Sequence, residues 1–250
     1  MSKENINSKV ILSLLMPVYN GEQYLQETLN CILRQTFKNF ELIILDNLSN
    51  DNSQKIIKSF QKNDNRIKYI LDTQKRNGND CWHELIKYTN GKYLIPINDD
   101  NYFNDNFFEI LVNKIQKKNL DMVICNGCYV DENKNYKGKF YKKKMHYFGK
   151  PNLIRIIRFF LKGHVIPLLL PSIYLVKSYK KNLPFINLSL FENDADTLFG
   201  VQVLSNFEID IHDEQLFFCR VYLKHDRFHD NKVPNSFLNI FKERIKHDIN

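Results

Sequence analysis

Two adjacent carboxylates, Asp99 and Asp100, follow an apolar run in the segment "LIPINDDNYF" at residues 94–103. Such a run is typical of a buried strand, so the pair is expected at the edge of the hydrophobic core. An acidic turn is one interpretation of the pair. The other is a cation site, because Mg²⁺ takes one or two protein carboxylates together with water and phosphate oxygens, and Mn²⁺ prefers the same oxygen ligands.

Two further polar clusters also follow apolar runs. Pro17, Tyr19 and Asn20 end the run that begins near residue 10, and Asp46 ends the run 40–45. The carboxyl ends of parallel strands meet at one edge of a sheet, where ligands bind. If the strands are parallel, all three clusters share one rim, which favours a binding pocket over an acidic turn.

The elements that must position these residues alternate along the first half of the chain. Apolar runs alternate with segments of helical periodicity up to about residue 130, which predicts an α/β fold with a mainly parallel, Rossmann-like sheet flanked by helices. The predicted strands are 9–20, 40–47, 66–71, 92–98 and 120–127, and the predicted helices are 21–36, 49–62, 80–89 and 104–118. The pattern then changes, with strand-like segments at 206–210 and 214–223 and a helix at 235–247. We therefore expect two halves, 1–130 and a smaller 131–250.

Several classes of protein are excluded or disfavoured by the sequence. The 250 residues contain neither a P-loop nor a G-x-G-x-x-G motif, so the usual nucleotide-hydrolase, kinase and dinucleotide fingerprints are missing. The N-terminus does not resemble a secretory signal, and the longest apolar run, 165–176, is too short and proline-rich to cross a bilayer. Five cysteines without a signal indicate a cytoplasmic protein. Cys125 and Cys128 lack a second pair at zinc-like spacing, which favours buried thiols.

Residues 10–53 resemble the start of an inverting family 2 glycosyltransferase with the GT-A fold. They follow the family's "P-x-Y-N" turn, its helix ending in "Q-T", and its strand and "D-D-G-S-x-D" loop. The segment "NGKYLIPINDDNYF" at 90–103 is similar to the family's "G-x-Y-I" strand and D-x-D-type metal motif. The resemblance is strong to about residue 130 and looser to about residue 222.

This resemblance implies roles for the polar residues at the strand ends. Asp46 would accept a hydrogen bond from the base, as in uridine recognition, and Asp100 occupies the position of the aspartate that binds Mn²⁺ or Mg²⁺. Asp99 would lie beside it, near the ribose or the metal. The residues that would line the nucleotide pocket are Pro17, Tyr19 and Asn20. Three positions depart from the family: Asn98 and Asn47 stand where aspartates are usual, and Leu48 replaces a glycine.

The resemblance also implies a general base in the acidic segment "FENDADTLFG" at 191–200. Asp194 stands where the family has the aspartate that takes a proton from the acceptor hydroxyl as that oxygen attacks the anomeric carbon. Asn193 replaces the usual glutamate, and Asp196 is the trailing acid. The alternative is that Asp194 and Asp196 only cap a helix, and Glu192 is a second candidate for the base.

Two other segments follow the family only in part. Arg220 fits the family's "Y-R-x-H" segment, but Tyr222 stands at the histidine position, and His225 is the nearby alternative. The segment after residue 75 keeps the start of an "N-x-G-x-x-x-A-R-N" motif, whereas His83 and Glu84 replace its Arg-Asn. We therefore assign no donor contact to His83 or Glu84.

The net charge of +8 is concentrated in one segment. Residues 137–162 hold nine Lys or Arg and no acid, while the remaining 27 basic residues face 28 acidic ones. No nucleic-acid module is recognisable, so no nucleic-acid partner is predicted. Arg155, Arg158 and Lys162 fall on one face of a predicted helix, which favours an anionic membrane surface. The alternatives are a basic helix packed on the acceptor half and a contact with a lipid-diphosphate-linked acceptor.

Together these features predict a metal-dependent, inverting glycosyltransferase. It would move a sugar from a nucleotide-sugar donor to a glycan or lipid-linked glycan acceptor, in bacterial cell-surface polysaccharide or glycolipid synthesis. The role that the resemblance implies for Asp46 favours a UDP-linked donor. The enzyme would act in the cytoplasm, peripherally on the inner membrane face. The asparagines at positions 47, 98 and 193 leave open an inactive nucleotide-sugar-binding module. A hydrolase with two carboxylates is a third possibility, which the nucleotide-like first half disfavours.

Overall fold

The apolar runs of the first hundred residues form adjacent parallel strands. In the computed structural model, which describes residues 10–139, 172–182, 203 and 206–221, β1 (Leu12–Val18) pairs with β2 (Phe40–Asp46) and β4 (Tyr93–Pro96). β2 also pairs in parallel with β3 (Ile67–Leu71). Every residue of β2 and β4 is buried, as expected for parallel strands covered by helices on both faces.

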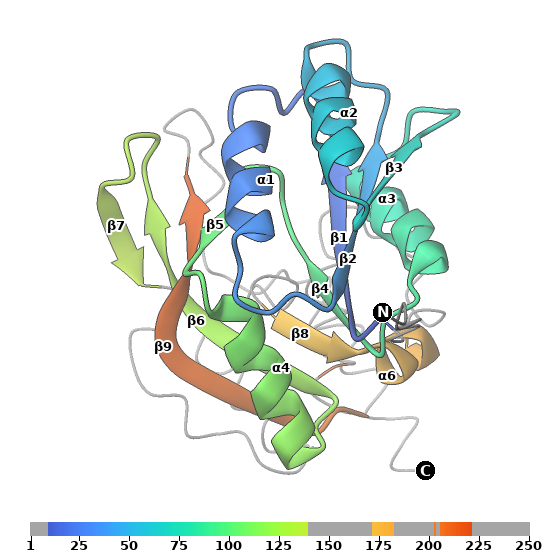
Figure 1. Ribbon diagram of the computed structural model, residues 1–250. Helices are drawn as coiled ribbons and strands as arrows, with labels where there is room; N and C mark the ends of the chain where they lie inside the picture. Colours follow the sequence, from blue (N-terminus) through green and yellow to red (C-terminus); the bar gives the residue numbers. More distant parts are fainter. Residues whose placement is uncertain (1–9, 140–171, 183–202, 204–205, 222–250) are drawn as a thin grey trace, which may run out of the picture.

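The rest of the nine-stranded sheet is mixed, in the order β3-β2-β1-β4-β8-β6-β9-β5 with β7 on β6 (Figure 1). β8 (Ser172–Leu175) lies antiparallel between β4 and β6 (Met122–Val130). The strand predicted at 120–127 therefore exists as β6, but a strand from the second half separates it from the parallel core. The strands of both proposed halves share one sheet, and the boundary near residue 130 stays a prediction.

The far side of the sheet is built around β9 (Ile209–Arg220). Parts of the two strand-like segments predicted at 206–210 and 214–223 lie in this one strand, which pairs in parallel with β6 and shifts register around Asn126. β9 also pairs with β5 (Tyr102–Phe103), and β6 pairs with β7 (Tyr136–Lys139). The short β5 brings the chain that follows Asp100 alongside the end of β9.

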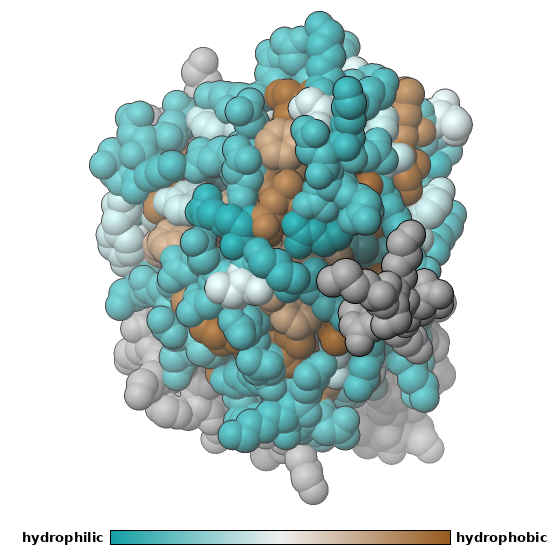
Figure 2. Space-filling model, in the orientation of Figure 1, coloured by the Kyte–Doolittle hydropathy of each residue, from teal (hydrophilic) through white to brown (hydrophobic). Residues whose placement is uncertain are grey.

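Helices cover both faces of the sheet. The side chains of α1 (Leu25–Leu33), α2 (Ser53–Asn63) and α4 (Phe107–Lys118) pack into one hydrophobic cluster. Those of α3 (Gly78–Leu85) and its following 3₁₀ turn (Ile86–Tyr88) pack into a second cluster, against which α6 (Val176–Asn182) also lies. In the view of Figure 2, hydrophilic residues cover most of the surface and apolar atoms show between them.

Some predictions fall on residues that the structure does not describe. These are the candidate base Asp194 with Glu192 and Asp196, the helix with Arg155 and Arg158, and the C-terminal helix at 235–247. Within the described ranges, no helix is long and apolar enough to cross a membrane.

Candidate functional site

The three polar clusters lie at one edge of the sheet, as their sequence positions predict. The parallel register places Val18 opposite Asp46, and Leu15 opposite Pro96. The loops after β1 and β2 also contact each other directly, because the Asn47 N–H donates to the Val18 carbonyl at 2.8 Å. The shared rim is therefore confirmed.

The loop after β1 presents one aromatic ring and is tied to its neighbours. Tyr19 is 52% exposed, and Pro17 is half-buried beside it. Asn20 has a positive φ of 53°, donates its N–H to Ser49 Oγ at 3.0 Å, and accepts the Asn50 N–H on Oδ1 at 2.9 Å. Asn20 thus shapes the loop through its own hydrogen bonds, and its contact with a nucleotide stays a prediction.

The loops after β1 and β4 approach each other closely at Gly21. A Cβ atom at Gly21 would collide with the Asp99 carboxylate. The Gly21 N–H donates to Ser53 Oγ, at the start of α2, at 2.9 Å. The backbone of the β1 loop therefore lies directly against the side chain of Asp99.

Asp46 is buried and bonded on both carboxylate oxygens. Oδ1 accepts the Ser49 N–H at 2.8 Å, and Oδ2 accepts the Tyr69 hydroxyl at 3.1 Å. Burial and the Asp46 charge raise the pKa of Tyr69, so this hydroxyl keeps its proton. In the described structure Asp46 fixes the β2 loop, and its contact with a base stays a prediction.

The residue after Asn47 keeps a glycine-like backbone although it is not glycine. Leu48 has a φ of 59° and is 40% exposed. The left-handed conformation costs a residue with a Cβ roughly 1–2 kcal/mol. The loop therefore retains the shape that the family's glycine would allow, at the expense of stability, and such strain is often kept at functional sites.

The side chain of Thr28 in α1 contacts the backbone of the carboxylate pair after β4. Thr28 Oγ1 lies 2.9 Å from both the Asp99 and Asn101 carbonyl oxygens. Burial, together with the charges of Asp100 and Asp51, raises the pKa of Asp99 to about 7. Like charges brought together in this way resist ionisation, and a cation bound between them would offset the repulsion.

The carboxylates of Asp99 and Asp100 are the kind of ligand that a divalent cation binds. Within the described part of the chain, no group of three or more His, Cys, Asp or Glu residues is arranged to hold a metal ion. A site with two protein carboxylates needs no such group when water and phosphate oxygens complete the shell. Asp99 and Asp100 therefore suit an ion that is bound together with a diphosphate.

Arg220, at the end of β9, holds the backbone of this carboxylate loop. The residue is buried, with 4% exposed, and its Nη1 donates to the Asp100 carbonyl at 2.6 Å. Nη2 donates to Glu27 Oε2 of α1, also at 2.6 Å. The guanidinium carbon lies 4.2 Å from the ring centre of Tyr24 and 5.3 Å from that of Tyr102. Arg220 thus joins β9, α1 and the loop after β4.

Glu27 also forms an ion pair with a lysine in the turn between β6 and β7. Lys134 Nζ lies 2.8 Å from Glu27 Oε1, opposite the oxygen that Arg220 contacts. Burial raises the pKa of Glu27, but Lys134 and Arg220 outweigh it and hold that pKa below its ordinary value. A charged Glu27 therefore anchors Arg220 against α1.

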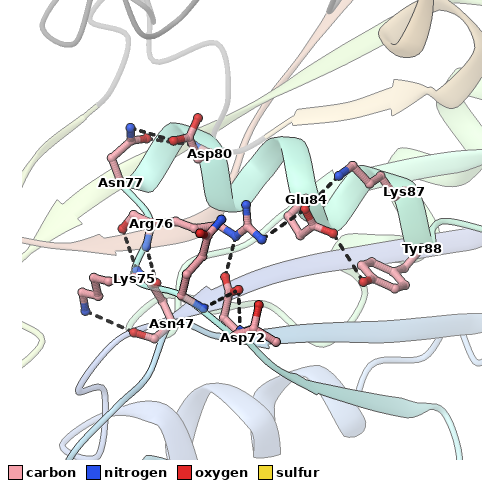
Figure 3. Close-up of polar contacts among 11 residues, drawn as sticks. Asn47, Asp72, Lys75, Arg76, Asn77, Asp80, Glu84, Lys87 and Tyr88 are labelled. Atoms are coloured by element: carbon pink, nitrogen blue, oxygen red, sulfur yellow. Dashed lines mark hydrogen bonds and ion pairs between the residues drawn. The ribbon is translucent and has the colours of Figure 1, made fainter.

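The loop between β3 and α3 also borders the rim, through residues that the sequence did not single out. Lys75 lies over the Tyr19 ring. Arg76 is hydrogen-bonded to Asn47 (Figure 3). Only their proximity to the "N-x-G" segment at Asn77 could have drawn attention to them. Glu84 contacts Arg76, at 3.5 Å from Nη2, and so supports this loop from α3.

The parallel core of β1 to β4, with helices on both faces of the sheet, places the chain in the α/β class of folds. Residues 13–176 match glycosyl transferase family 2, and the chain belongs to that family. The crystal structure of S. aureus TarS 1-349 in complex with UDP superposes on 84% of this chain and 60% of that chain, with a TM-score of 0.67 and 20% identity. The predicted GT-A fold is confirmed.

Two curated relatives each match about half of the chain. Glycosyltransferase GlyG of Streptococcus pneumoniae is 33% identical over 131 residues, which are 52% of this chain and 42% of that protein. The Escherichia coli UDP-Glc:alpha-D-GlcNAc-diphosphoundecaprenol beta-1,3-glucosyltransferase WfgD is 26% identical over 130 residues, 52% of this chain and 50% of that protein. The matches thus span half or less of these two relatives.

Proposed function

We propose that this chain transfers a sugar from a UDP-sugar to a hydroxyl of a glycan acceptor, with inversion at the anomeric carbon. The observation that carries the proposal is the single rim on which the Tyr19 loop, the Asp46 loop and the Asp99–Asp100 pair converge. Membership of glycosyl transferase family 2 supports the reaction class. The UDP in the TarS structure and the UDP-Glc in the name of WfgD support the donor class.

The donor would bind across the ends of β1, β2 and β4. The Tyr19 ring is half exposed and carries Lys75 over one face, so its remaining surface would be offered to a base, and Pro17 and Asn20 would complete that side of the site. Asp46 would face the base from the β2 loop. These four side chains lie at the ends of β1 and β2 and in the loop after β1, which is hydrogen-bonded to the loop after β2, so the base would meet a site formed before it binds.

Asp100 would bind Mn²⁺ or Mg²⁺, with Asp99 beside it. When bound, the ion would supply Lewis-acid stabilisation of the diphosphate leaving group. The chain's own contribution is to keep both carboxylates in place. Thr28 and Arg220 contact the backbone carbonyls of this loop from α1 and β9.

Asp194 would act as the general base, although it lies outside the described residues. Its carboxylate would accept the proton of the acceptor hydroxyl while that oxygen attacks the anomeric carbon from the face opposite the diphosphate. One displacement of this kind inverts the anomeric configuration. Base catalysis of this kind is typically worth about 10²–10⁴ in rate.

The acceptor side would contact a lipid-linked glycan at a membrane surface. The name of WfgD includes a diphosphoundecaprenol-linked acceptor, and the basic segment 137–162 of this chain supplies charges for such a surface. Each Lys or Arg near an anionic membrane contributes about 1 kcal/mol, so several would hold the protein reversibly. Salt should weaken this attraction by screening.

Sedimentation with liposomes tests the membrane part of the proposal. The wild type should bind anionic vesicles more than neutral ones, and Arg155→Glu with Arg158→Glu should reduce that binding. Equal binding to both lipids, or no effect of the double substitution, would remove the membrane from the proposal and leave a soluble acceptor.

The reaction itself is tested by incubating the protein and Mn²⁺ with a panel of nucleotide sugars and measuring nucleotide release. Faster release from a UDP-sugar than from its GDP counterpart is expected, with a further increase when an acceptor glycan is added. Tight UDP-sugar binding without any turnover across acceptors would instead identify an inactive binding module.

A further inference from the structure

Asn47 uses both ends of its amide on the backbone of one residue. Its Oδ1 accepts the Arg76 N–H at 2.8 Å, and its Nδ2 donates to the Arg76 carbonyl at 2.9 Å (Figure 3). The Asn47 side chain is buried, with 6% of the residue exposed. Position 47 therefore needs one acceptor and one donor, which an amide provides and an ionised carboxylate does not.

The side chain of Arg76 is held independently of its backbone. Its Nε donates to Asp72 Oδ2 at 2.6 Å, and its Nη2 lies 3.5 Å from Glu84 Oε2 on α3. The Asp72 N–H in turn donates to the Asp46 carbonyl at 2.9 Å. The loop of residues 72–77 is thus tied to the end of β2 at one side and to α3 at the other.

Lys75 lies next to this bonded pair and points to the rim. Its Nζ donates to the Asn47 carbonyl at 3.1 Å and lies 2.6 Å from the ring centre of Tyr19. An ammonium over an aromatic face is attracted to the ring. Because Lys75 directly precedes Arg76, a fixed Arg76 backbone limits where the exposed Lys75 places its charge, which lies over the face of the Tyr19 ring.

We propose that Asn47 is a positioning residue that fixes the loop of residues 72–77, so that Lys75 presents its charge to the phosphates of the donor. This inference rests on the proposed donor site and adds a positioning residue and a phosphate-binding cation to it. Asn47 contributes through Arg76 and not through the base, because both ends of its amide are already bonded. The asparagine at this position is then an adaptation of the loop and not a sign of an inactive site.

The family's aspartate should be harmful at position 47 in this chain. In Asn47→Asp one carboxylate oxygen still accepts the Arg76 N–H, but the other faces the Arg76 carbonyl, so two acceptors meet. A buried group left without its partner is costly, and the fixed loop would become a minor conformation. If only about a tenth of the molecules keep that loop, the apparent affinity for UDP falls about tenfold.

Calorimetric titration of UDP with Mn²⁺ tests this inference against its opposite. The expected result is about tenfold weaker binding for Asn47→Asp. The control is Asn39→Asp, which makes the same change of charge at the opposite end of the strands and should leave UDP affinity unchanged. Equal or tighter binding by Asn47→Asp would overturn the proposal, because restoring the usual aspartate would then have improved the site.

A second variant tests the role of the Lys75 charge separately from any loss of folding. Lys75 is exposed, so Lys75→Met should fold normally and should weaken UDP binding at least fivefold. Binding of uridine, which has no phosphate, should not weaken. Unchanged UDP binding, or an equal loss for uridine, would remove Lys75 from the donor site.

Hydrogen exchange of the nucleotide-free protein tests the loop itself. Asn47→Asp should speed exchange of the Arg76 amide and its neighbours at 72–77, while the amides of β1 and β2 stay protected. Unchanged exchange in that loop would refute the positioning role whatever UDP does. A wild type that fails to bind UDP would instead contradict the proposed donor, and the exchange result would still decide the role of Asn47.

Discussion

Replacing Arg220 by methionine should destabilise the fold and disable the carboxylate loop together. Methionine keeps an apolar side chain of similar length between Tyr24 and Tyr102, so the packing is largely retained. The variant removes the donors to the Asp100 carbonyl and to Glu27, both 2.6 Å away. The effect should therefore come from the lost hydrogen bonds and the lost charge.

The size of the effect follows from the burial of the two contacts. Hydrogen bonds to charged groups are worth about 1.5–3 kcal/mol each. The bond to the Asp100 carbonyl starts from a guanidinium side chain that is 1% exposed, whereas the Glu27 side chain is 37% exposed and is screened by solvent. The free energy of unfolding should fall by about 2–4 kcal/mol.

Urea denaturation measures this change, and Arg34→Met is the matched control. Arg34 pairs with Asp105 at 2.6 Å, but both side chains are more than half exposed, so its loss should cost at most about 1 kcal/mol. Arg220→Lys should fall between, since one ammonium cannot reproduce the two-pronged contact. UDP affinity with Mn²⁺ should drop for Arg220→Met alone. Equal stability of the two methionine variants would refute the reasoning.

Three further predictions concern the loop strain, the pH dependence and the base. Leu48→Gly should raise the free energy of unfolding by up to about 1 kcal/mol in the same assay, because φ = 59° costs leucine and not glycine, whereas Leu71→Gly in a strand should lower it. Burial raises the pKa of Glu41, but its bonds to Lys68, Ser13 and Asn90 outweigh this effect and hold the pKa below its ordinary value of 4.5. The free energy of unfolding should therefore fall as the pH drops below about 4.5, and in Glu41→Gln it should fall less over the same pH range. Asp194→Asn should keep UDP binding but lower turnover at least a hundredfold, and near-normal turnover would move the base to Glu192 or away from this segment.

The parallel core could be predicted because its signals are local. The runs at Leu12–Val18 and Phe40–Asp46 are mainly apolar and almost wholly buried, as parallel strands covered on both faces are, and polar residues follow each of them. Alternation with helices then fixes the direction of the strands, and with it the rim that joins Asp46 to the Asp99–Asp100 pair.

The remaining features depend on contacts between distant parts of the chain. Ser172–Leu175 inserts between β4 and β6, and nothing in its four residues specifies those neighbours. Arg220 reaches Asp100 and Glu27 across 120 and 193 positions of sequence. The pairing of Asn47 with the Arg76 backbone could not be predicted from the type of residue 76, because every residue except proline offers the same N–H and carbonyl.

The most direct test of the proposed donor site is calorimetric titration of UDP into the wild type and Asp100→Ala, each with and without Mn²⁺. Asp105→Ala, five positions along the chain and 59% exposed in its side chain, controls for the loss of a nearby acid. We predict that Mn²⁺ strengthens UDP binding to the wild type and to Asp105→Ala. Asp100→Ala should lose this dependence on Mn²⁺ and should still show the thermal unfolding transition of a folded protein. Unchanged Mn²⁺-dependent UDP binding by Asp100→Ala would contradict the assignment of the site.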